Sequence, residues 1–408
     1  MKGSVRIREV ATKIGSGQTP RGGHRSYGSK GIPLIRSQNV LMGAFSAEGL
    51  AFISCEIDEA MEGSRVQQGD VLLNITGASI GRVCVVPTEI CPANVNQHVC
   101  IIRCNESIDP EYLSAFMAAP NFQRNISDAQ AGGTRQALTK QTIEEFEIPL
   151  IPIDEQRLIA SQLKRQQLEL SRARQVMTNI GRKVELLRAS IYRESFCSIV
   201  PVATSKNLEE PSYGWHWHKL SNAARLESGH TPSRLRPDWW GGDISWLSLT
   251  EIRALDGQWV ESTQLRTNEA GVANSAARIL PRGTVCFSRT ASVGFVAIMA
   301  KPMATSQDFA NWVCSDDLDP EFLMYALIRS RNELRGLATG ATHKTIYMPT
   351  LESFHICAPD LGTQRRIVRT LRERLAAVES LHAGLEQQAK DLAALPQRLL
   401  ARAFGGAA

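Results

Sequence analysis

The sequence predicts two α/β (α+β) globular domains joined by an antiparallel two-helix coiled coil, with pseudo-two-fold symmetry. Three observations predict this fold class. A long series of motifs occurs twice in the 408 residues, the second part of each copy has apolar residues at seven-residue spacing, and the first part has short apolar runs between glycine-containing turns. A chain of this length exceeds one ordinary domain, so two cores are expected.

The internal repeat is the strongest of these observations because the motifs keep their order. Four motif pairs carry it: SGQTP at 16–20 with SGHTP at 228–232, GDVLLNITGASIG at 69–81 with GTVCFSRTASVG at 283–294, DPEYL at 109–113 with DPEFL at 319–323, and GGTRQALTKQTIEEFEI at 132–148 with GATHKTIYMPTLESFHI at 340–356. The spacing between copies drifts in this first part and is constant afterwards. Surface loops tolerate such changes in length, whereas one residue inserted into a packed helix turns its apolar stripe by ~100°.

The second part of each copy has the spacing of a coiled coil. The apolar positions are Leu163, Leu170, Met177, Val184 and Ile191 in copy one, with Ala173, Ile180 and Leu187 between them, and Leu371, Val378, Leu385, Leu392 and Leu399 in copy two, with Leu381 and Leu395. The alternative is an ordinary amphipathic helix on a globular core. Antiparallel pairing fits the short connection, because a parallel pair would need ~19 residues to span the ~60 Å length of a helix.

These patterns give the expected domain boundaries. The divisions are 1–153 for the first domain, 154–197 for the central long helix, 198–216 for a linker, 217–361 for the second domain, 362–404 for the distal long helix and 405–408 for a tail. Within the domains, VLLNI, VCVV, CIIR, VCFS and FVAIM are expected as short buried strands, and DPEYLSAFM and DPEFLMYALI as helices.

Composition excludes several classes of protein. No run approaches the ~18 apolar residues of a membrane span, and the N-terminal residues lack an apolar signal core, so a cytoplasmic protein is expected. Nine cysteines without a CxxC pair argue against a disulfide framework or zinc ribbon and favour buried reduced thiols. A net charge of +5 permits nucleic-acid binding without establishing it.

No motif indicates an active site. DPEY at 109–112 resembles the loop that amino-methyltransferases use to hold a target amine, but a helix start is favoured because Asp caps, Pro suits the first turn and an apolar helix pattern follows. Phosphate-binding, zinc-protease and nucleophile-elbow motifs are missing. We therefore expect a non-catalytic protein with no catalytic residue, cofactor site or metal site.

The chain resembles the specificity subunit of Type I restriction-modification systems. The resemblance rests on the two SGxTP segments, the GxxxG-type turns that end at Gly81 and Gly294, the GxT loops, the EQR and TQR starts of the long helices at 155–157 and 363–365, and the LPQRLLARAFGG end at 395–406. It covers nearly the whole chain and implies two target-recognition domains that read an asymmetric bipartite site in double-stranded DNA. Two methyltransferase subunits, which use S-adenosylmethionine, and ATP- and Mg-dependent restriction subunits are the implied partners, and the coiled coil is implied to set the gap between half-sites and to dock the methyltransferases.

Candidate DNA contacts lie at repeated loop positions. Phosphates favour Lys, Arg, Ser and Thr, while bases are read by Arg, Asn and Gln. The candidates in copy one are Arg21, His24, Arg25, Lys30, Arg36, Gln38, Asn39, Asn74, Thr76, Ser79, Thr134, Arg135 and Gln136; in copy two they are Arg234, Arg236, Ser248, Thr250, Arg289, Thr290, Ser292, Thr342, His343 and Lys344. For each residue alone, a solvated surface role is the alternative.

Two features at these positions leave further choices open. Asn39 and Arg36 stand where copy two has Glu251 and Ser248, which fits unlike targets. Trp239 and Trp240 could stack on DNA, although aromatic core packing is favoured. At the level of function, the alternatives are a stand-alone two-headed DNA-binding regulator, a self-sufficient methyltransferase, and a subunit of a methylation-only or other phage-defence complex.

Overall fold

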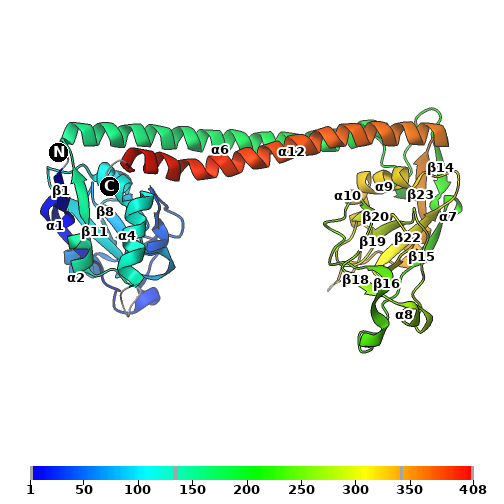
Figure 1. Cartoon of the computed structure of the whole chain (residues 1–408), viewed down its shortest axis with the longest axis horizontal. Helices are drawn as coiled ribbons and strands as arrows, with labels where there is room; N and C mark the ends of the chain where they lie inside the picture. The colour runs from blue at the N-terminus through cyan, green and yellow to red at the C-terminus, as the bar shows by residue number, and fades with distance from the viewer. Residues whose placement is uncertain (1–2, 132–136, 341–342, 406–408) are drawn as a thin grey trace. The chain divides into compact units, whose positions relative to one another are not determined.

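The computed structural model describes residues 3–131, 137–340 and 343–405, and of His24 and Ala131 the backbone only. The chain divides into two compact units (Figure 1). Unit 1 comprises Met1–Thr178 with Glu386–Ala408, and unit 2 comprises Asn179–Leu385. Each unit therefore contains one globular domain and part of both long helices.

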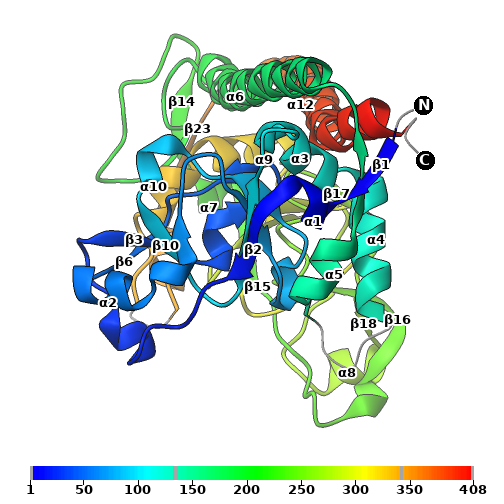
Figure 2. The same ribbon diagram turned by 90° about the vertical axis from the view of Figure 1, so that its left-hand side faces the viewer.

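Unit 1 is built on two four-stranded sheets, with orders β2-β11-β8-β9 and β6-β3-β10-β7, which lie side by side in Figure 2. Its elements are β1 (Gly3–Arg6), α1 (Ile7–Val10), β2 (Ala11–Ser16), β3 (Ile32–Ile35), β4 (Val40–Leu41), β5 (Ala44–Phe45), β6 (Ala51–Ile53), α2 (Cys55–Ala60), β7 (Arg65–Val66), β8 (Val71–Asn74), β9 (Val83–Val85), β10 (Ala93–Val95), β11 (Val99–Cys104), α3 (Pro110–Met117), α4 (Pro120–Ala131), α5 (Lys140–Glu145) and β12 (Glu147–Leu150), followed by the long helix α6 (Ile153–Ser195).

Unit 2 contains sheets with orders β15-β22-β19-β20-β17, β18-β16-β21 and β13-β23-β14. Its elements are β13 (Val202–Thr204), β14 (His216–Lys219), α7 (Leu220–Ala223), β15 (Ala224–Ser228), β16 (Trp240–Leu247), β17 (Trp259–Val260), β18 (Leu265–Thr267), α8 (Glu269–Ala273), β19 (Val285–Ser288), β20 (Val296–Met299), β21 (Ala304–Thr305), β22 (Phe309–Cys314), α9 (Pro320–Arg329), α10 (Arg331–Arg335), α11 (Met348–Glu352) and β23 (Phe354–Ala358), followed by the long helix α12 (Leu361–Phe404).

The two units repeat one topology, which confirms the predicted duplication and the mixed α/β class. The order β2-β11-β8-β9 of unit 1 returns as β15-β22-β19-β20 in unit 2, and β6-β3-β10 returns as β18-β16-β21. Both units contain one parallel pair of strands that are distant in sequence at this place, β3 with β10 in unit 1 and β16 with β21 in unit 2. The five predicted strand segments coincide with β8, β9, β11, β19 and β20.

The DPE motifs begin helices, as predicted. Asp109 accepts hydrogen bonds from the amides of Glu111 and Tyr112, both at 3.0 Å, at the start of α3. Asp319 does the same for α9, at 2.9 and 3.1 Å. Tyr112 is buried in the core and its hydroxyl donates to the Pro149 carbonyl at 3.2 Å. The capping interpretation of this motif is therefore confirmed.

The two long helices are antiparallel within each unit. In unit 1, Leu163 and Leu400 share one core cluster, and further along α6 the Arg174 guanidinium lies 3.4 Å from the Leu392 carbonyl oxygen. In unit 2, Arg188 pairs with Glu379 at 2.9 Å, and Arg374 with Glu194 at 3.1 Å. Residue numbers rise along one helix as they fall along the other, which confirms antiparallel pairing.

The ends of the helices are part of the domain cores rather than separate from them. In unit 1, Phe404 of α12 packs edge-on against Tyr112 and Phe116, with ring centroids 5.6 and 5.4 Å apart. In unit 2, Phe196, which follows α6, lies 5.4 Å from Phe322 of α9. Each domain is therefore fastened by aromatic contacts to the C-terminal end of one long helix, α12 in unit 1 and α6 in unit 2.

Three expectations need correction. Ile180, Leu187 and Leu381 were expected in the seam of the coiled coil but are 38%, 45% and 54% exposed, because the pairing face runs through Val184, Ile191 and Val378 instead. Cys55 and Cys197 are exposed rather than buried, since Cys55 faces outward in the first turn of α2 and Cys197 lies in the turn after α6. Within the segment 198–216, Val202–Thr204 forms β13, which pairs with β23.

Candidate nucleic-acid interface

The SGxTP segment contacts the dipeptide that follows β10 or β21, in the same way in both units. Thr19 donates a hydrogen bond from its Oγ1 to Oε1 of Gln97, and Thr231 donates to Gln307 at 2.6 Å. The glycine of the motif permits this approach, because a Cβ on Gly17 would lie 1.7 Å from the carbonyl oxygen of Val95. A Cβ on Gly229 would lie 2.1 Å from Oγ1 of Thr305.

The turn between β8 and β9 and the residues after the GxT loop reach the same place in unit 1. Thr76 hydrogen-bonds through Oγ1 to Nδ1 of His98, the neighbour of Gln97. Thr76 also forms an isolated β-bridge with Ala137. Three loops that are distant in sequence thus meet around Thr76, Gln97 and His98.

Unit 2 repeats this convergence with different side chains. Arg289 donates from Nε and Nη2 to the Gln307 carbonyl at 3.1 and 2.8 Å, and Thr290 forms a β-bridge with Thr345. The amide of Ala291 donates to the Lys344 carbonyl at 2.9 Å. We call the place around Thr76, Gln97 and His98 in unit 1, and around Arg289, Thr290 and Gln307 in unit 2, the loop junction.

Several predicted contact residues have buried side chains that hold the loops. Asn39 is fully buried, accepts from the Arg36 amide at 3.0 Å and donates to the Ser46 carbonyl at 2.9 Å. Asn74 is also fully buried and donates to the Ser37 carbonyl at 2.8 Å. In unit 2, Ser248 is 5% exposed and shares a hydrogen bond with Thr250 at 2.7 Å. In this conformation the polar groups of Asn39, Asn74 and Ser248 form hydrogen bonds within the protein.

Glu251, which stands where unit 1 has Asn39, likewise supports its loop from inside. The Glu251 carboxylate is buried and accepts a hydrogen bond from the Gln264 amide at 3.1 Å. Both side chains therefore fasten the segment that follows them, one with an amide and the other with a carboxylate. Arg36 is half-buried and donates to the Gly49 carbonyl at 2.5 Å.

Other predicted residues remain available at the surface. The exposed ones are Arg21, Arg25, Lys30 and Gln38 in unit 1 and Arg234, Arg236, Thr250, His343 and Lys344 in unit 2; Thr76, Ser79, Arg289, Thr290 and Ser292 are half-buried. Thr134, Arg135, Gln136 and Thr342 lie outside the described residues, as does the side chain of His24. The junction in unit 2 brings together Arg289, Thr290, Ser292, His343 and Lys344.

The tryptophans of β16 and the turn before it pack within the protein. The ring of Trp240 meets the buried Trp246 edge-on at a centroid distance of 5.0 Å, and the Arg234 guanidinium lies 5.8 Å from the Trp240 ring. Arg236 lies 5.0 Å from the Trp239 ring and pairs with Asp238 at 2.7 Å. These contacts agree with aromatic packing, while Arg234, Trp240 and Arg266 still line a shallow pocket.

Sequence reasoning missed a group of arginines in unit 2. Arg253, Arg331 and Arg335 surround the ring of Phe295, with guanidinium carbons 5.7, 5.4 and 5.4 Å from its centroid. We call these three residues the arginine cluster. The run RSRNELR at 329–335 was a visible signal, but Arg253 comes from a distant segment that only the fold brings near.

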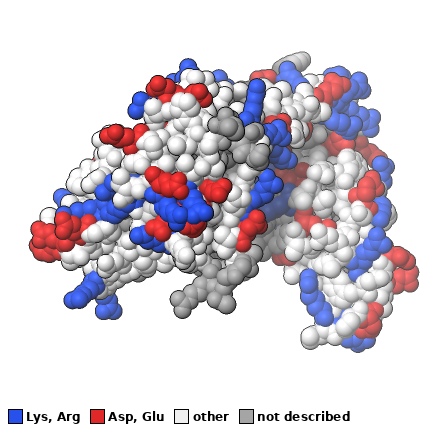
Figure 3. Space-filling view, turned by 60° about the vertical axis from the view of Figure 1, so that its left-hand side comes forward, with Lys and Arg blue, Asp and Glu red and all other residues white. Residues whose placement is uncertain are grey.

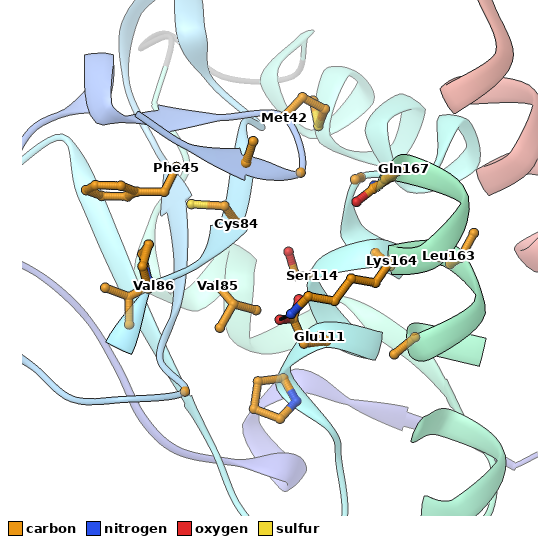
Figure 4. Close-up of a pocket in the computed structure, with 18 of the residues that line it drawn as sticks. Met42, Phe45, Cys84, Val85, Val86, Glu111, Ser114, Leu163, Lys164 and Gln167 are labelled. Atoms are coloured by element: carbon orange, nitrogen blue, oxygen red, sulfur yellow. Dashed lines mark hydrogen bonds and ion pairs between the residues drawn. The ribbon is translucent and has the colours of Figure 1, made fainter. Parts of the chain in front are cut away.

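A further pocket, of about 600 Å³, lies in unit 1, and none of the predicted contact residues that the structure describes lines it (Figure 4). Lys164 of α6 extends into it toward Glu111 of α3, at 3.0 Å, while Met42 and Phe45 line it from the β4–β5 hairpin. Burial raises the pKa of the Cys84 thiol at its wall to about 12, so this thiol stays protonated.

Unit 2 has a more extensive set of contacts at the repeat of this ion pair. Arg372 and Glu321, the repeats of Lys164 and Glu111, form a pair at 2.5 Å, and Trp259 donates to the same carboxylate at 2.7 Å. The Glu321 carboxylate thus has two side-chain partners, whereas Glu111 pairs with Lys164.

Charge is distributed without one dominant basic surface on the face seen in Figure 3, where Lys and Arg side chains alternate with Asp and Glu over a largely uncharged surface. Within residues 3–131, 137–340 and 343–405, no group of three or more His, Cys, Asp or Glu side chains could hold a metal ion. No helix among these residues is both long enough and apolar enough to span a bilayer. The loop junctions and the arginine cluster are the two groups of polar side chains on which a functional proposal can rest.

Comparison with known proteins gives one consistent family. The model of the Type I restriction modification DNA specificity domain matches the chain twice, at residues 2–175 and 213–390. A Type I restriction enzyme specificity subunit, MjaIX of Methanocaldococcus jannaschii, is 28% identical over 159 residues, which cover 38% of this chain and 37% of that protein. The chain thus spans less than half the length of that relative.

Two longer matches cover most of the chain. The StySPI specificity subunit of Salmonella potsdam is 19% identical over 392 residues, 92% of this chain and 82% of that protein. A solved structure described as the structural basis of complex assembly and conformational transition of the type I R-M system has a TM-score of 0.73 at 20% identity, covering 98% of this chain and 97% of that one. At that identity the likeness establishes the fold.

Proposed function

Because the chain belongs to the family of Type I restriction modification DNA specificity domains, we propose that it is the non-catalytic subunit that reads an asymmetric, bipartite DNA site for a restriction-modification complex. Each unit contributes one target-recognition domain. The loop junction of each domain contacts one half-site, and methyltransferase subunits supply the chemistry.

The observation that carries this proposal is the repetition of the loop junction with unlike side chains. The same threonine–glutamine contact, Thr19 with Gln97 and Thr231 with Gln307, holds the loops together in both units. Around this shared framework, which includes the repeated threonines Thr76 and Thr290, unit 1 places His98 whereas unit 2 places Arg289. A repeated framework with different charged or polar side chains around it suits two domains that read different base sequences.

The exposed arginines, lysines and hydroxyl groups near the junctions suit contacts with the DNA backbone. Such contacts fix the position of a protein on the duplex, whereas contacts with base edges carry the sequence information. Asn39, Asn74 and Ser248 support their loops from inside in this proposal. Among the exposed predicted residues, Gln38 of unit 1 is of a type suited to contact adenine, although in this conformation its Nε2 donates to the Gly49 carbonyl at 3.2 Å.

The long helices offer a surface for partners. Six residues of α6 are large, apolar and exposed, namely Leu158, Leu168, Val176, Ile180, Leu186 and Leu187. Three of them belong to unit 1 and three to unit 2, and at ~100° per residue those of each unit fall within about 120° of the helix circumference. A one-sided apolar face that water would otherwise cover supports docking of methyltransferase subunits, which bring S-adenosylmethionine. ATP- and Mg-dependent restriction subunits are the further partners that the family implies.

The test is to express the chain with the methyltransferase subunits of its own system and to measure methyl transfer to DNA. We expect methylation only when both are present, at a motif of two unlike halves separated by a fixed gap. Methyl transfer by the pure chain would make it a methyltransferase. Sequence-specific binding by a chain that never co-purifies with methyltransferase subunits would make it a stand-alone regulator.

A further inference from the structure

The arginine cluster surrounds an aromatic ring, and one of its three members has an acidic partner. The ring of Phe295 lies within 5.7 Å of all three guanidinium groups, and a ring face attracts a cation. Arg331 and Arg335 stand at the two ends of the short helix α10, while Arg253 comes from the segment before β17. Three like charges are thus brought together from two segments.

Only one of the three arginines has a carboxylate partner among the described residues. Arg331 donates from Nη2 to both oxygens of Asp256 at 2.7 Å. Arg335 donates from Nε to the Val293 carbonyl at 2.8 Å, and Arg253 donates to Oγ of Ser292 at 3.3 Å. Two positive charges therefore meet only neutral acceptors.

The electrostatic environment of Arg335 reflects this imbalance. Burial lowers the pKa of its guanidinium below the ordinary value, and the charges of Arg331 and Arg253 act in the same direction while that of Asp256 opposes them. Like charges held this close repel one another, and an anion between them relieves the repulsion. The cluster is therefore arranged to accept negative charge.

A pocket of about 530 Å³ opens beside the cluster. Arg253, Arg335, His343 and Lys344 line it with Phe295 and Ser292. His343 and Lys344 follow the GxT loop, and the amide of Ala291 donates to the Lys344 carbonyl at the loop junction. The pocket thus adjoins the place where we propose that unit 2 meets DNA.

Unit 1 has a neutral side chain at the equivalent corner. In unit 2 a Cβ on Gly294 would lie 3.0 Å from Arg331 and 3.2 Å from Arg335. In unit 1 a Cβ on Gly81 would lie 2.6 Å from Gln123, whose Nε2 donates to the carbonyls of Gly81 and Met117 at 2.9 and 2.7 Å. The glutamine is engaged with the backbone and carries no charge.

We propose that the pocket lined by Arg253, Arg335 and Lys344 binds one backbone phosphate of DNA, and that the two domains therefore differ in their electrostatic share of binding. This inference rests on the proposed function. Guanidinium groups form paired, charge-assisted hydrogen bonds with phosphate oxygens, and the pocket adjoins the loop junction where we propose that DNA binds.

The experiment measures affinity of the full chain for a fluorescent DNA duplex over a series of salt concentrations. Each phosphate contact contributes a slope of about 0.9 in the logarithmic plot of affinity against salt. Arg335→Gln should reduce the slope by about that amount and weaken binding roughly tenfold at 0.1 M salt, and Arg335→Lys should restore most of the slope. Arg253→Gln should act in the same direction.

Arg124→Gln is the matched control, because Arg124 is an exposed arginine on α4 of unit 1 and its loss removes the same charge. An unchanged slope for both Arg335→Gln and Arg253→Gln, in folded protein that still binds DNA, overturns the inference alone. A wild-type chain that binds no duplex overturns the proposed function instead. Stabilisation of the wild type but not of Arg335→Gln by inorganic phosphate, with equal salt slopes on DNA, would assign the pocket to free phosphate and also overturn the inference.

Discussion

The side chain of Gln156 accepts a hydrogen bond from the backbone amide of Asp109 at 2.8 Å, and Gln364 accepts one from Asp319 at 2.9 Å. Gln156 is fully buried and also donates to the carbonyls of Ser107 and Ile151 at 3.0 and 2.8 Å. The first turn of each long helix is thereby tied to the residue that caps α3 or α9. The relationship explains why a glutamine recurs at the start of both long helices.

Replacing Gln156 with Leu should destabilise unit 1. The substitution leaves one amide and two carbonyl groups without their buried partner, so we expect a loss of about 3 kcal/mol. The free energy of unfolding of unit 1, obtained from urea titration of the wild type and the variant, measures this loss. Gln166→Leu, at an exposed position of the same helix, should change stability by less than about 0.5 kcal/mol. Equal effects of the two variants would show that the buried hydrogen bonds contribute nothing.

Gly17→Ala should disrupt the loop junction of unit 1. Its Cβ would lie 1.7 Å from the carbonyl oxygen of Val95, so the backbone must separate at a cost of about 2 kcal/mol or more. We expect a lower melting temperature and weaker DNA binding. Gly15→Ala is the control, because nothing lies within 4 Å of its Cβ. A Gly17→Ala protein as stable as Gly15→Ala would contradict the close approach.

The repeated carboxylates Glu111 and Glu321 should differ in their contribution to stability. Glu111 pairs with Lys164 at an exposed site, where side chains are 48% and 74% exposed, so Glu111→Ala should cost at most about 1 kcal/mol. Glu321 is 11% exposed and also accepts from Trp259. Glu321→Ala strands that indole donor and should cost about 2 kcal/mol. Thermal unfolding of both variants measures these losses. A larger loss of stability for Glu111→Ala than for Glu321→Ala would refute this ranking.

Leu186→Glu should impair assembly with methyltransferase subunits and leave the fold intact. Leu186 is 65% exposed, so a surface change there should alter stability by less than about 0.5 kcal/mol. Ala189→Glu adds the same charge at an exposed position outside the apolar face. Co-purification with the methyltransferase subunits compares them. If both variants assemble like the wild type, the apolar face of α6 is not the docking surface.

The duplicated fold was predictable because the segments that occur twice in the sequence indicate where its strands and helices lie. Segments such as VLLNI became β8, and Asp109 capped α3, since both depend on local apolar pattern and capping chemistry. The part of the chain between Val202 and Thr204 became a strand only through its partner β23, which no local pattern reveals.

The candidate site was less predictable, for a physical reason. An asparagine such as Asn74 suits a base edge and a protein carbonyl equally well, and only its burial against Ser37 decides between them. Conversely, Arg253 and Arg335 gained their importance from each other's proximity, across many intervening residues. Residue type indicated the chemistry, whereas tertiary contacts decided which side chains remain available.

The most direct measurement is the map of methylated bases in the DNA of cells that carry this chain with its methyltransferase subunits, compared with a chain whose residues 217–361 come from another member of the family. The account predicts a motif of two unlike halves for the original chain, and for the exchanged chain a change confined to one half. Methylation at one uninterrupted motif, or a change in both halves after the exchange, would contradict recognition by two independent domains.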